Sequence, residues 1–404
     1  MTHTFVIVGN GIAGITAAAT LAEDAPDSRI LVYADEEHPY YRRPWLPDFL
    51  AGNYKIDELY AYPSAWYEKR RIQVRLNAKV AAIDVAAQTV SLASGEAVHY
   101  DKLLLAGGGN SFVPPVNNTN IKGVFTLRSL DNALAIREYA LTRQAAVVVG
   151  GGLLGLETAR GLKGLGLTVT VIEVLPRLLP RQLDEEGAAV LTRLIEQIGI
   201  TVVTGATVEA VTGDSEATGV QLKSGKTYAG GLVLFSAGIR PNLELPKKID
   251  LAVNRGVVAD EHMRTSAPNV FVSGDMAEFK ERVYGIIPAA IEQARIAAAN
   301  MLSPDSATYG GTIPINTLKV MGIDLTSIGL VNPEEPGYVA YRKSDSTKGL
   351  YKKLVFKDGG LVGAILLGDR KSVTSMTRLV NRKAAVEALA SQMLEDGFDF
   401  KPLL

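Results

Sequence analysis

The 404-residue sequence contains no cysteine, so this chain cannot form disulfides, hold zinc through thiolates or ligate an iron–sulfur cluster. Histidine is also scarce. His3, His38, His99 and His262 are scattered without the spacing of metal ligands, and we predict no metal site. The formal net charge of −1 provides no bulk field that favours nucleic acid or an anionic membrane.

Long apolar runs are missing as well, because none reaches the roughly 18–20 residues of a membrane span. The stretch from Phe5 to Ala22 is apolar, but no basic segment precedes it and Gly9-Asn10-Gly11 interrupts it. We interpret it as a strand and a helix rather than a signal sequence. A cytoplasmic protein of about two to three domains, without a nucleic-acid or membrane partner, is therefore expected.

The first motif follows the apolar segment Thr4–Val8. Gly9, Gly11 and Gly14 form G-x-G-x-x-G, which brings backbone amides close to a pyrophosphate at a helix N-terminus. Alone it is weak, since ordinary turns also carry this spacing. A second apolar segment ends just before Asp35 and Glu36, where a carboxylate would bind a ribose hydroxyl.

The same pattern occurs again later in the chain. After the apolar segment Ala146–Val149, Gly150, Gly152 and Gly155 repeat the glycine spacing, and Thr168–Ile172 leads to Glu173. Two such units predict two dinucleotide sites, and two different dinucleotides would allow a hydride to pass between them. A carboxylate at Glu173 repels a ribose 2′-phosphate and favours NADH over NADPH, although Arg177 and Arg181 lie nearby and weaken this preference.

Both units end on a buried strand that enters a glycine turn, at Ala106-Gly107 and at Ala237-Gly238. Further on, a strand ends in Gly274-Asp275, and we expect Asp275 to face a polyhydroxyl chain such as the ribitol of a flavin. The helix that begins near Ala289 and Ala290 would direct its N-terminal dipole at a flavin ring. The aromatic and arginine-rich loop 38–52 is either a ligand-contacting loop or an aromatic core patch with solvated arginines.

Together these residues resemble the two-dinucleotide-binding-domain flavoprotein reductases, the family that includes glutathione reductase. The resemblance is closer to NADH:rubredoxin reductases and to the flavin part of NADH-dependent nitrite reductases. The segments that carry it are Pro39–Leu46, Gly150–Glu157 with Glu173, Thr265-Ser266 ahead of Val270–Asp275, Leu318–Gly329 and Leu361–Asp369.

The resemblance implies an α/β fold with two Rossmann-like domains, for FAD and NADH, plus a small C-terminal α+β domain. Its boundaries are 1–112 and 243–309 for the FAD-binding domain, 113–242 for the NAD(H)-binding domain and 310–404 for the C-terminal domain. Arg43 would lie near the FAD pyrophosphate and Glu157 near the nicotinamide. The implied cofactor-binding residues are Gly9, Gly11, Ile12, Ala13, Gly14, Asp35, Glu36, Arg42, Arg43, Pro44, Val80, Ala106, Gly107, Gly150, Gly152, Leu153, Leu154, Gly155, Glu157, Glu173, Ala237, Gly238, Gly274, Asp275, Ala289 and Ala290.

The sequence departs from the family pattern in two places. It lacks the cysteine pair of the disulfide reductases, so electrons cannot pass through an internal disulfide. It also has Asp48 where ferredoxin-reductase-like relatives usually have a lysine that pairs with the residue matching Glu157. If both are buried near the flavin, one of these two carboxylates would be protonated. Glu157 and Asp48 are the expected catalytic residues.

The implied function is electron transfer from NADH through FAD to a small one-electron carrier such as rubredoxin. A basic rim from Arg42, Lys319 or Lys352-Lys353 would steer an acidic carrier, although the two-lysine pair is also typical of an ordinary solvated surface. The alternatives are an NADH oxidase or diaphorase that reduces oxygen or quinones, an NADH-input subunit of a larger redox complex, and a nucleotide sensor without turnover. A monomer or homodimer is expected.

Overall fold

The protein is described by a computed structural model that covers residues 3–320 and 322–404. Met321, within the Leu318–Gly329 segment, and the side chain of Lys319 lie outside the described part. The chain forms two compact units. The first unit comprises Met1–Arg43, Lys55–Asn110 and Ile239–Thr312, and the second comprises Pro44–Tyr54, Ser111–Gly238 and Ile313–Leu404. The three-domain division of the sequence stays a prediction.

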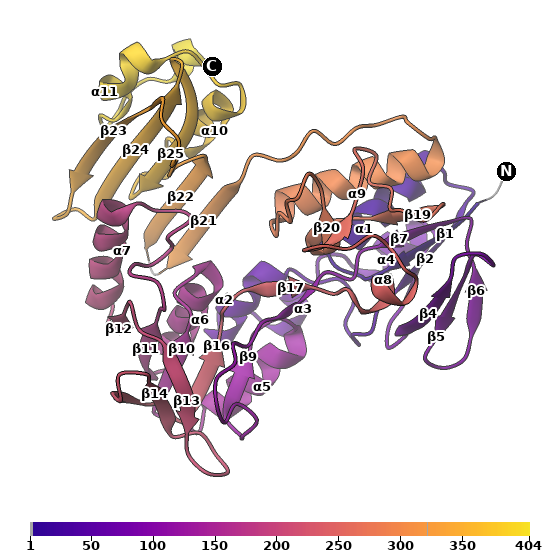
Figure 1. Cartoon of the computed structure of the whole chain (residues 1–404), viewed down its shortest axis with the longest axis horizontal. Coiled ribbons are helices and arrows are strands. Elements are labelled where there is room, and N and C mark those ends of the chain that lie inside the picture. Colours follow the sequence, from indigo (N-terminus) through magenta and orange to yellow (C-terminus); the bar gives the residue numbers. More distant parts are fainter. Residues whose placement is uncertain (1–2, 321) are drawn as a thin grey trace. The chain divides into compact units, whose positions relative to one another are not determined.

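The first unit is built around a five-stranded parallel sheet in the order β19-β7-β1-β2-β3 (Figure 1). Its central strand is apolar from Phe5 to Val8, and Phe5, Val6 and Ile7 are fully buried because both faces of a parallel sheet are covered by other elements. The strands are β1 (Thr4–Val8), β2 (Arg29–Tyr33), β3 (Ile72–Arg75), β7 (Lys102–Leu105) and β19 (Val270–Val272).

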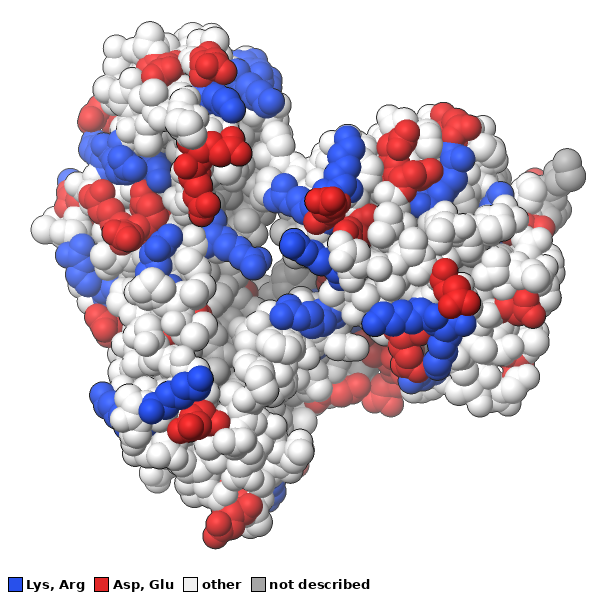
Figure 2. Space-filling view, in the orientation of Figure 1, with Lys and Arg blue, Asp and Glu red and all other residues white. Residues whose placement is uncertain are grey.

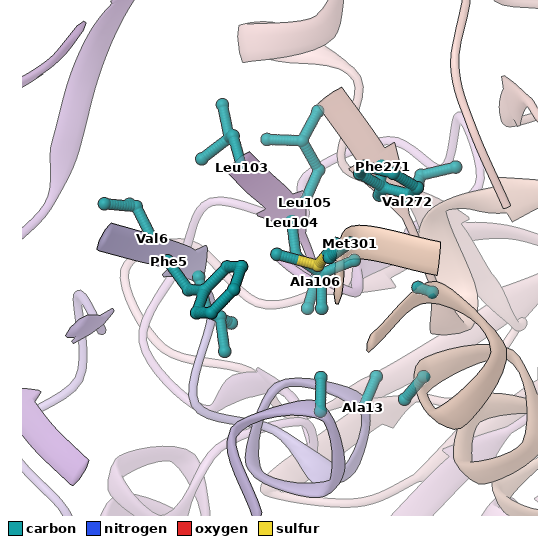
Figure 3. Close-up of a cluster of buried hydrophobic side chains, with 14 of the residues drawn as sticks. Phe5, Val6, Ala13, Leu103, Leu104, Leu105, Ala106, Phe271, Val272 and Met301 are labelled. Atoms are coloured by element: carbon teal, nitrogen blue, oxygen red, sulfur yellow. The ribbon is translucent and has the colours of Figure 1, made fainter. Parts of the chain in front are cut away.

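Two helices pack against each other beside this sheet, α1 (Ile12–Asp24) and α9 (Ile287–Leu302). Both are rich in alanine on their buried sides, which allows the helices to approach closely. In Figure 3, Phe5, Leu104 and Met301 belong to one apolar cluster drawn from β1, β7 and α9. This core holds the carboxyl ends of the strands in place next to the start of α1.

The second unit repeats the arrangement with a five-stranded parallel sheet in the order β12-β11-β10-β16-β9. Val149 is paired with Ile172 just as Val8 is paired with Tyr33. Its strands are β9 (Val124–Thr126), β10 (Ala145–Val149), β11 (Thr168–Ile172), β12 (Ile200–Val203) and β16 (Leu232–Phe235), and its helices are α5 (Leu130–Ala140), α6 (Leu153–Gly164) and α7 (Glu185–Gln197).

The two sheets differ in where their fifth strand comes from. In the second unit β9 precedes the glycine motif, whereas in the first unit β19 comes from the chain's return after residue 239. The outgoing and returning segments pair as β8 (Gly109–Ser111) and β17 (Ile239–Pro241). The second nucleotide unit is therefore an insertion within the first.

A small antiparallel sheet accompanies each parallel sheet. The first contains β4 (Val80–Asp84), β5 (Thr89–Leu92) and β6 (Ala97–His99). The second contains β13 (Val208–Thr212), β14 (Gly219–Leu222) and β15 (Thr227–Ala229). Each of these small sheets comes after the glycine motif of its unit in the sequence.

The C-terminal part forms an antiparallel sheet in the order β21-β22-β25-β24-β23, with one face covered by helices. Its elements are β21 (Ile315–Val320), β22 (Ile323–Gly329), β23 (Tyr338–Asp345), β24 (Leu350–Lys357), β25 (Gly360–Leu367), α10 (Val373–Asn381) and α11 (Ala390–Met393). The predicted α/β fold, with two Rossmann-like cores and a smaller C-terminal α+β domain, is confirmed.

Short elements connect these layers. They are α2 (Leu46–Leu50), α3 (Ile56–Leu59), α4 (Ser64–Lys69), α8 (Glu244–Lys248), β18 (Val257–Val258), β20 (Ala277–Glu278) and the 3₁₀ turns η1 (Arg43–Trp45), η2 (Gly274–Met276), η3 (Glu387–Leu389) and η4 (Lys401–Leu403). Across the described residues, every helix is too short or too polar to cross a bilayer.

Candidate dinucleotide-binding sites

The two glycine motifs fold into closely similar turns. Gly9 and Gly150 both have positive φ, 112° and 123°, a conformation that a side chain would strain. Each donates its backbone N–H to the last residue of the neighbouring strand, Tyr33 in one unit and Ile172 in the other, at 2.8 Å. The chain therefore turns sharply from strand to helix at the same point in both units.

The third glycine of each motif permits close packing. A Cβ on Gly14 would overlap the carbonyl oxygen of Gly9, and one on Gly155 would overlap that of Gly150. The middle glycine has a different environment, because a Cβ on Gly11 or on Gly152 would meet no atom within 4 Å. The backbone is thus tightly packed behind the turn and open in front of it.

The open side is also the start of a helix. Gly11 is the N-cap of α1 and Gly152 that of α6, and neither cap residue has a side chain that could accept from the first amides. Uncapped amides at a helix N-terminus form an anion site. In the first unit both polar atoms of the Asn10 side chain are buried without a partner among the described residues, which is what a bound polar group would satisfy.

The acidic residues after the second strand differ between the units. Glu173 is buried and accepts from the N–H of Gly151 at 2.6 Å and of Leu175 at 2.8 Å, so its carboxylate is fixed at the edge of the turn. Two hydrogen bonds still leave acceptor capacity on its oxygens for a ribose hydroxyl.

In the first unit the residue that follows the second strand is Ala34, and the acids come later. Glu36 accepts from the Tyr41 hydroxyl at 2.6 Å and forms an ion pair with Arg43, whereas Asp35 is exposed. The sequence left open which acid binds a ribose. The structure shows that Glu36 already fixes Arg43, so Asp35 is the acid that faces solvent.

The chain's return brings a third segment to the first unit. Gly274 has a φ of 77° and donates its N–H to Oε1 of Gln293 on α9 at 2.9 Å. The Nε2 of Gln293 and the Oγ of Ser273 are buried without partners among the described residues. These residues were missed by sequence reasoning, and only the unusual presence of a glutamine in an alanine-rich helix hints at a role for Gln293.

The structure brings several predicted residues of the first unit together. Ala13 of α1 and Ala290 of α9 are the nearest neighbours of the position that a Cβ on Gly274 would occupy.

Gly107 follows β7 and donates its N–H to Sδ of Met276, while Val80 lies on β4 and Ala289 in the first turn of α9. Ile12 begins α1, and Ala106 is buried at the end of β7.

Of the remaining predicted residues, Leu153 and Leu154 form the first turn of α6, and Ala237 and Gly238 follow β16. Arg42 donates from its guanidinium to the carbonyl oxygen of Tyr60 at 3.2 Å. Pro44, directly after Arg43, is the first residue of the second unit. The roles proposed for these residues stay predictions.

The structure gives Asp48 a partner that the sequence analysis did not identify. Asp48 on α2 forms a salt bridge with Arg160 on α6, and α2 can approach because Gly161 leaves room for the Pro47 carbonyl. Arg160 lies one helical turn after Glu157 and was missed, although its i,i+3 spacing from Glu157 is visible in the sequence. The carboxylate of Asp48 therefore has a cationic partner, and the catalytic role expected for Asp48 and Glu157 stays a prediction.

The predicted basic rim is wrong for Lys352 and Lys353. Both are buried on β24, at 2% and 4% exposure. Lys352 pairs with Asp369 at 2.8 Å and Asp396 at 2.9 Å, and Lys353 pairs with Asp184 at 2.9 Å. Because neighbouring residues of a strand face opposite sides of the sheet, the two lysines form their ion pairs on opposite faces of the C-terminal sheet.

Comparison with known proteins agrees with this geometry. The profile of the family described as pyridine nucleotide-disulphide oxidoreductase matches residues 3–294, and that of the rubredoxin NAD+ reductase C-terminal domain matches residues 314–384. The NADH-rubredoxin oxidoreductase of Clostridium acetobutylicum is 30% identical over 96% of both chains. A crystal structure of the ferredoxin reductase for the CYP199A2 system of Rhodopseudomonas palustris covers 100% of both chains with a TM-score of 0.90 at 26% identity.

A longer relative matches over a comparable part of the chain. The nitrite reductase [NAD(P)H] of Bacillus subtilis is 33% identical over 94% of this chain, which spans only 47% of that protein's length. The two uncapped glycine turns, the buried unpartnered groups beside them and the profile match over most of the chain lead to one conclusion. The protein belongs to the pyridine nucleotide-disulphide oxidoreductase family.

Proposed function

We propose that the protein transfers electrons from NADH through FAD to a small one-electron carrier protein of the rubredoxin or ferredoxin type. FAD, when bound, accepts one hydride, which carries two electrons, and can release these electrons one at a time. The observation that carries the proposal is the pair of matched glycine turns in a chain that has no cysteine. Electrons that reach the flavin have no disulfide of this chain to enter, so the acceptor has to come from outside.

The first unit holds FAD in this proposal. The amides at the start of α1 bind the pyrophosphate, and the Asn10 side chain gains the polar partner that it lacks. Arg43, which is held in place by Glu36, contributes positive charge near the phosphates. The segment Ser273–Asp275 lies opposite, supported by Gln293, and supplies hydroxyl-binding groups for the ribitol.

The second unit holds NADH. The start of α6 binds its pyrophosphate, and the fixed carboxylate of Glu173 accepts from the adenosine ribose hydroxyls. A ribose 2′-phosphate would bring negative charge against that buried carboxylate, which favours NADH over NADPH. Glu157, in the second turn of α6, is the proposed residue near the nicotinamide.

Relatives support a protein carrier as the acceptor. The names of two similar proteins specify rubredoxin and a ferredoxin system. On the face shown in Figure 2, lysine and arginine side chains are interspersed with acidic ones rather than gathered in one large patch. We therefore expect carrier docking to depend on a few local charges and to show a moderate rather than a steep dependence on salt.

The test is anaerobic stopped-flow spectroscopy of the flavin. The protein is first reduced with one equivalent of NADH and then mixed either with an oxidised rubredoxin or ferredoxin, or with air-saturated buffer. The proposal predicts rapid flavin reoxidation by a carrier and much slower reoxidation by oxygen. Fast reoxidation in air with no gain from any carrier would contradict it and favour an NADH oxidase. A flavin that NADH does not bleach at all would favour a nucleotide sensor.

A further inference from the structure

The loop that joins β11 to α7, residues 173–184, begins at Glu173, the residue that accepts from the Gly151 N–H in the second glycine turn. Val174 and Leu175 at its start are exposed, whereas Leu178, Leu179 and Leu183 are buried. The loop also approaches the glycine turn, because the Leu179 N–H donates to the carbonyl oxygen of Gly151 at 3.4 Å. A change in the position of the loop would therefore move the glycine turn and Glu173 as well.

This loop contains a strained residue. Leu179 has a φ of 48°, in the left-handed region that bulky side chains disfavour. Such conformations persist where the surrounding structure holds them, and they concentrate at ligand-binding sites. Within the loop, the Leu179 carbonyl oxygen accepts from the N–H groups of Gln182 and Leu183, both at 2.9 Å, and contacts from outside the loop add to these bonds.

The C-terminal domain supplies those contacts. Asn332, which follows β22, donates from Nδ2 to the carbonyl oxygen of Leu183 at 2.9 Å and to that of Pro180 at 3.3 Å. Its Oδ1 accepts from Nζ of Lys353 at 3.3 Å. One amide side chain thus holds two carbonyl groups of the loop, one of them directly after Leu179.

A second group of contacts fixes the end of the same loop. Asp184 caps α7 by accepting from the Gly187 N–H at 3.1 Å, and its other oxygen accepts from the Tyr351 hydroxyl at 2.6 Å and pairs with Lys353 at 2.9 Å. The fit is close, since a Cβ on Gly187 would lie 2.8 Å from the Tyr351 ring. The domain therefore holds both the loop and the start of α7 (Figure 1).

We propose that Asn332 and Lys353 are positioning residues for NADH, and that the C-terminal domain sets dinucleotide affinity by holding the loop 173–184 in its strained conformation. The inference rests on the proposed placement of NADH at Glu173. It gives this domain a role within the nucleotide site, in addition to any contact with a carrier.

The test compares Asn332→Ala and Asn332→Asp with the wild-type holoprotein. The aspartate keeps the shape of the side chain and an acceptor for Lys353 but cannot donate to the two carbonyl groups, so it isolates the proposed bonds. A matched control is Asn381→Ala, at an exposed position at the end of α10 in the same domain. NAD+ binding is measured by calorimetry, and loop mobility by hydrogen exchange of peptides that span residues 174–183.

Both Asn332 variants should weaken NAD+ binding about tenfold, as expected for the loss of one to two hydrogen bonds, and should speed exchange in the loop. FAD content and the maximal rate with ferricyanide should remain unchanged, so that KM for NADH rises alone. Faster exchange with unchanged NAD+ affinity, or unchanged exchange, would overturn the inference. A parallel Glu173→Ala variant with wild-type NAD+ affinity would overturn the proposed NADH placement itself, and with it the inference.

Discussion

Asp48 and Arg160, which are 112 residues apart in the sequence, form a salt bridge between α2 and α6. Helix α2 lies in the aromatic and arginine-rich segment 38–52, and α6 follows the second glycine motif. Both helices belong to the second unit. Arg160 is mostly buried, and Asp48 is about one-third exposed at 34%. Arg160 is thus the cationic partner of an acid that occupies the position where ferredoxin-reductase-like relatives usually have a lysine.

Removing the arginine should destabilise the second unit. Arg160→Met leaves the Asp48 carboxylate without its cation, and a half-buried pair of this kind is worth about 1–2 kcal/mol, between exposed and fully buried pairs. We expect a thermal midpoint lower by about 2–6 °C, measured by circular dichroism. The swap Asp48→Lys with Arg160→Glu should recover much of the loss. The control Lys248→Met, in the exposed Glu244–Lys248 pair, should leave the midpoint unchanged.

Substitutions at the middle glycines of the two turns should each affect the binding of one cofactor only. A Cβ on Gly11 or Gly152 meets no protein atom, so each alanine variant should fold, but the methyl group projects where a pyrophosphate approaches the backbone. Gly11→Ala should reduce FAD content per chain, and Gly152→Ala should weaken NAD+ binding, each by about tenfold or ~1.4 kcal/mol. Flavin absorbance and NAD+ calorimetry measure the two effects. If either variant lost both cofactors equally, the assignment of one cofactor to each turn would fail.

Glu173 should determine the choice between NADH and NADPH. Glu173→Ala combined with Val174→Arg removes the carboxylate and adds a cation at an exposed neighbouring position, which should accommodate a 2′-phosphate. We expect the ratio of kcat/KM for NADPH to that for NADH to rise by about two orders of magnitude, or ~2.7 kcal/mol. Glu196→Ala, on the exposed side of α7, is the control and should leave the ratio unchanged. An unchanged ratio in the double variant would exclude Glu173 from the ribose site.

Acid should weaken the contact between α7 and the C-terminal sheet. Burial raises the pKa of Asp184, but hydrogen bonds from Tyr351, Lys353 and Gly187 outweigh this and leave the pKa below its usual value. A lowered pKa in the folded state contributes stability above the ordinary carboxyl pKa of about 4, and that contribution is lost as the pH falls below it. The thermal midpoint of the wild type should therefore approach that of Asp184→Asn as the pH falls below about 4 and on through the lowered folded-state pKa. Asp214→Asn, at an exposed loop position, should follow the wild type throughout; a constant gap for Asp184→Asn would contradict the prediction.

Much of the fold could be predicted from local patterns. The apolar strand, glycine turn and helix occur within about thirty residues in each motif, and such units encode a βαβ geometry without help from distant parts. The placement of Gly9 against Tyr33 and of Gly150 against Ile172 follows from that local geometry. Side chains that act across the fold, such as Gln293 beside Gly274, were not predicted because nothing near them in the sequence marks the contact.

The sequence by itself determined the two nucleotide motifs, the acid after the second strand and the lack of any internal disulfide. Only the tertiary structure decided which charges meet. Lys352 and Lys353 look like surface residues in the sequence, yet they are buried and paired with carboxylates from other elements, and Asp48 finds its partner on a distant helix. The physical reason is that a strand or a turn forms from neighbouring residues, whereas burial and ion pairing depend on which surfaces pack together after the chain has folded.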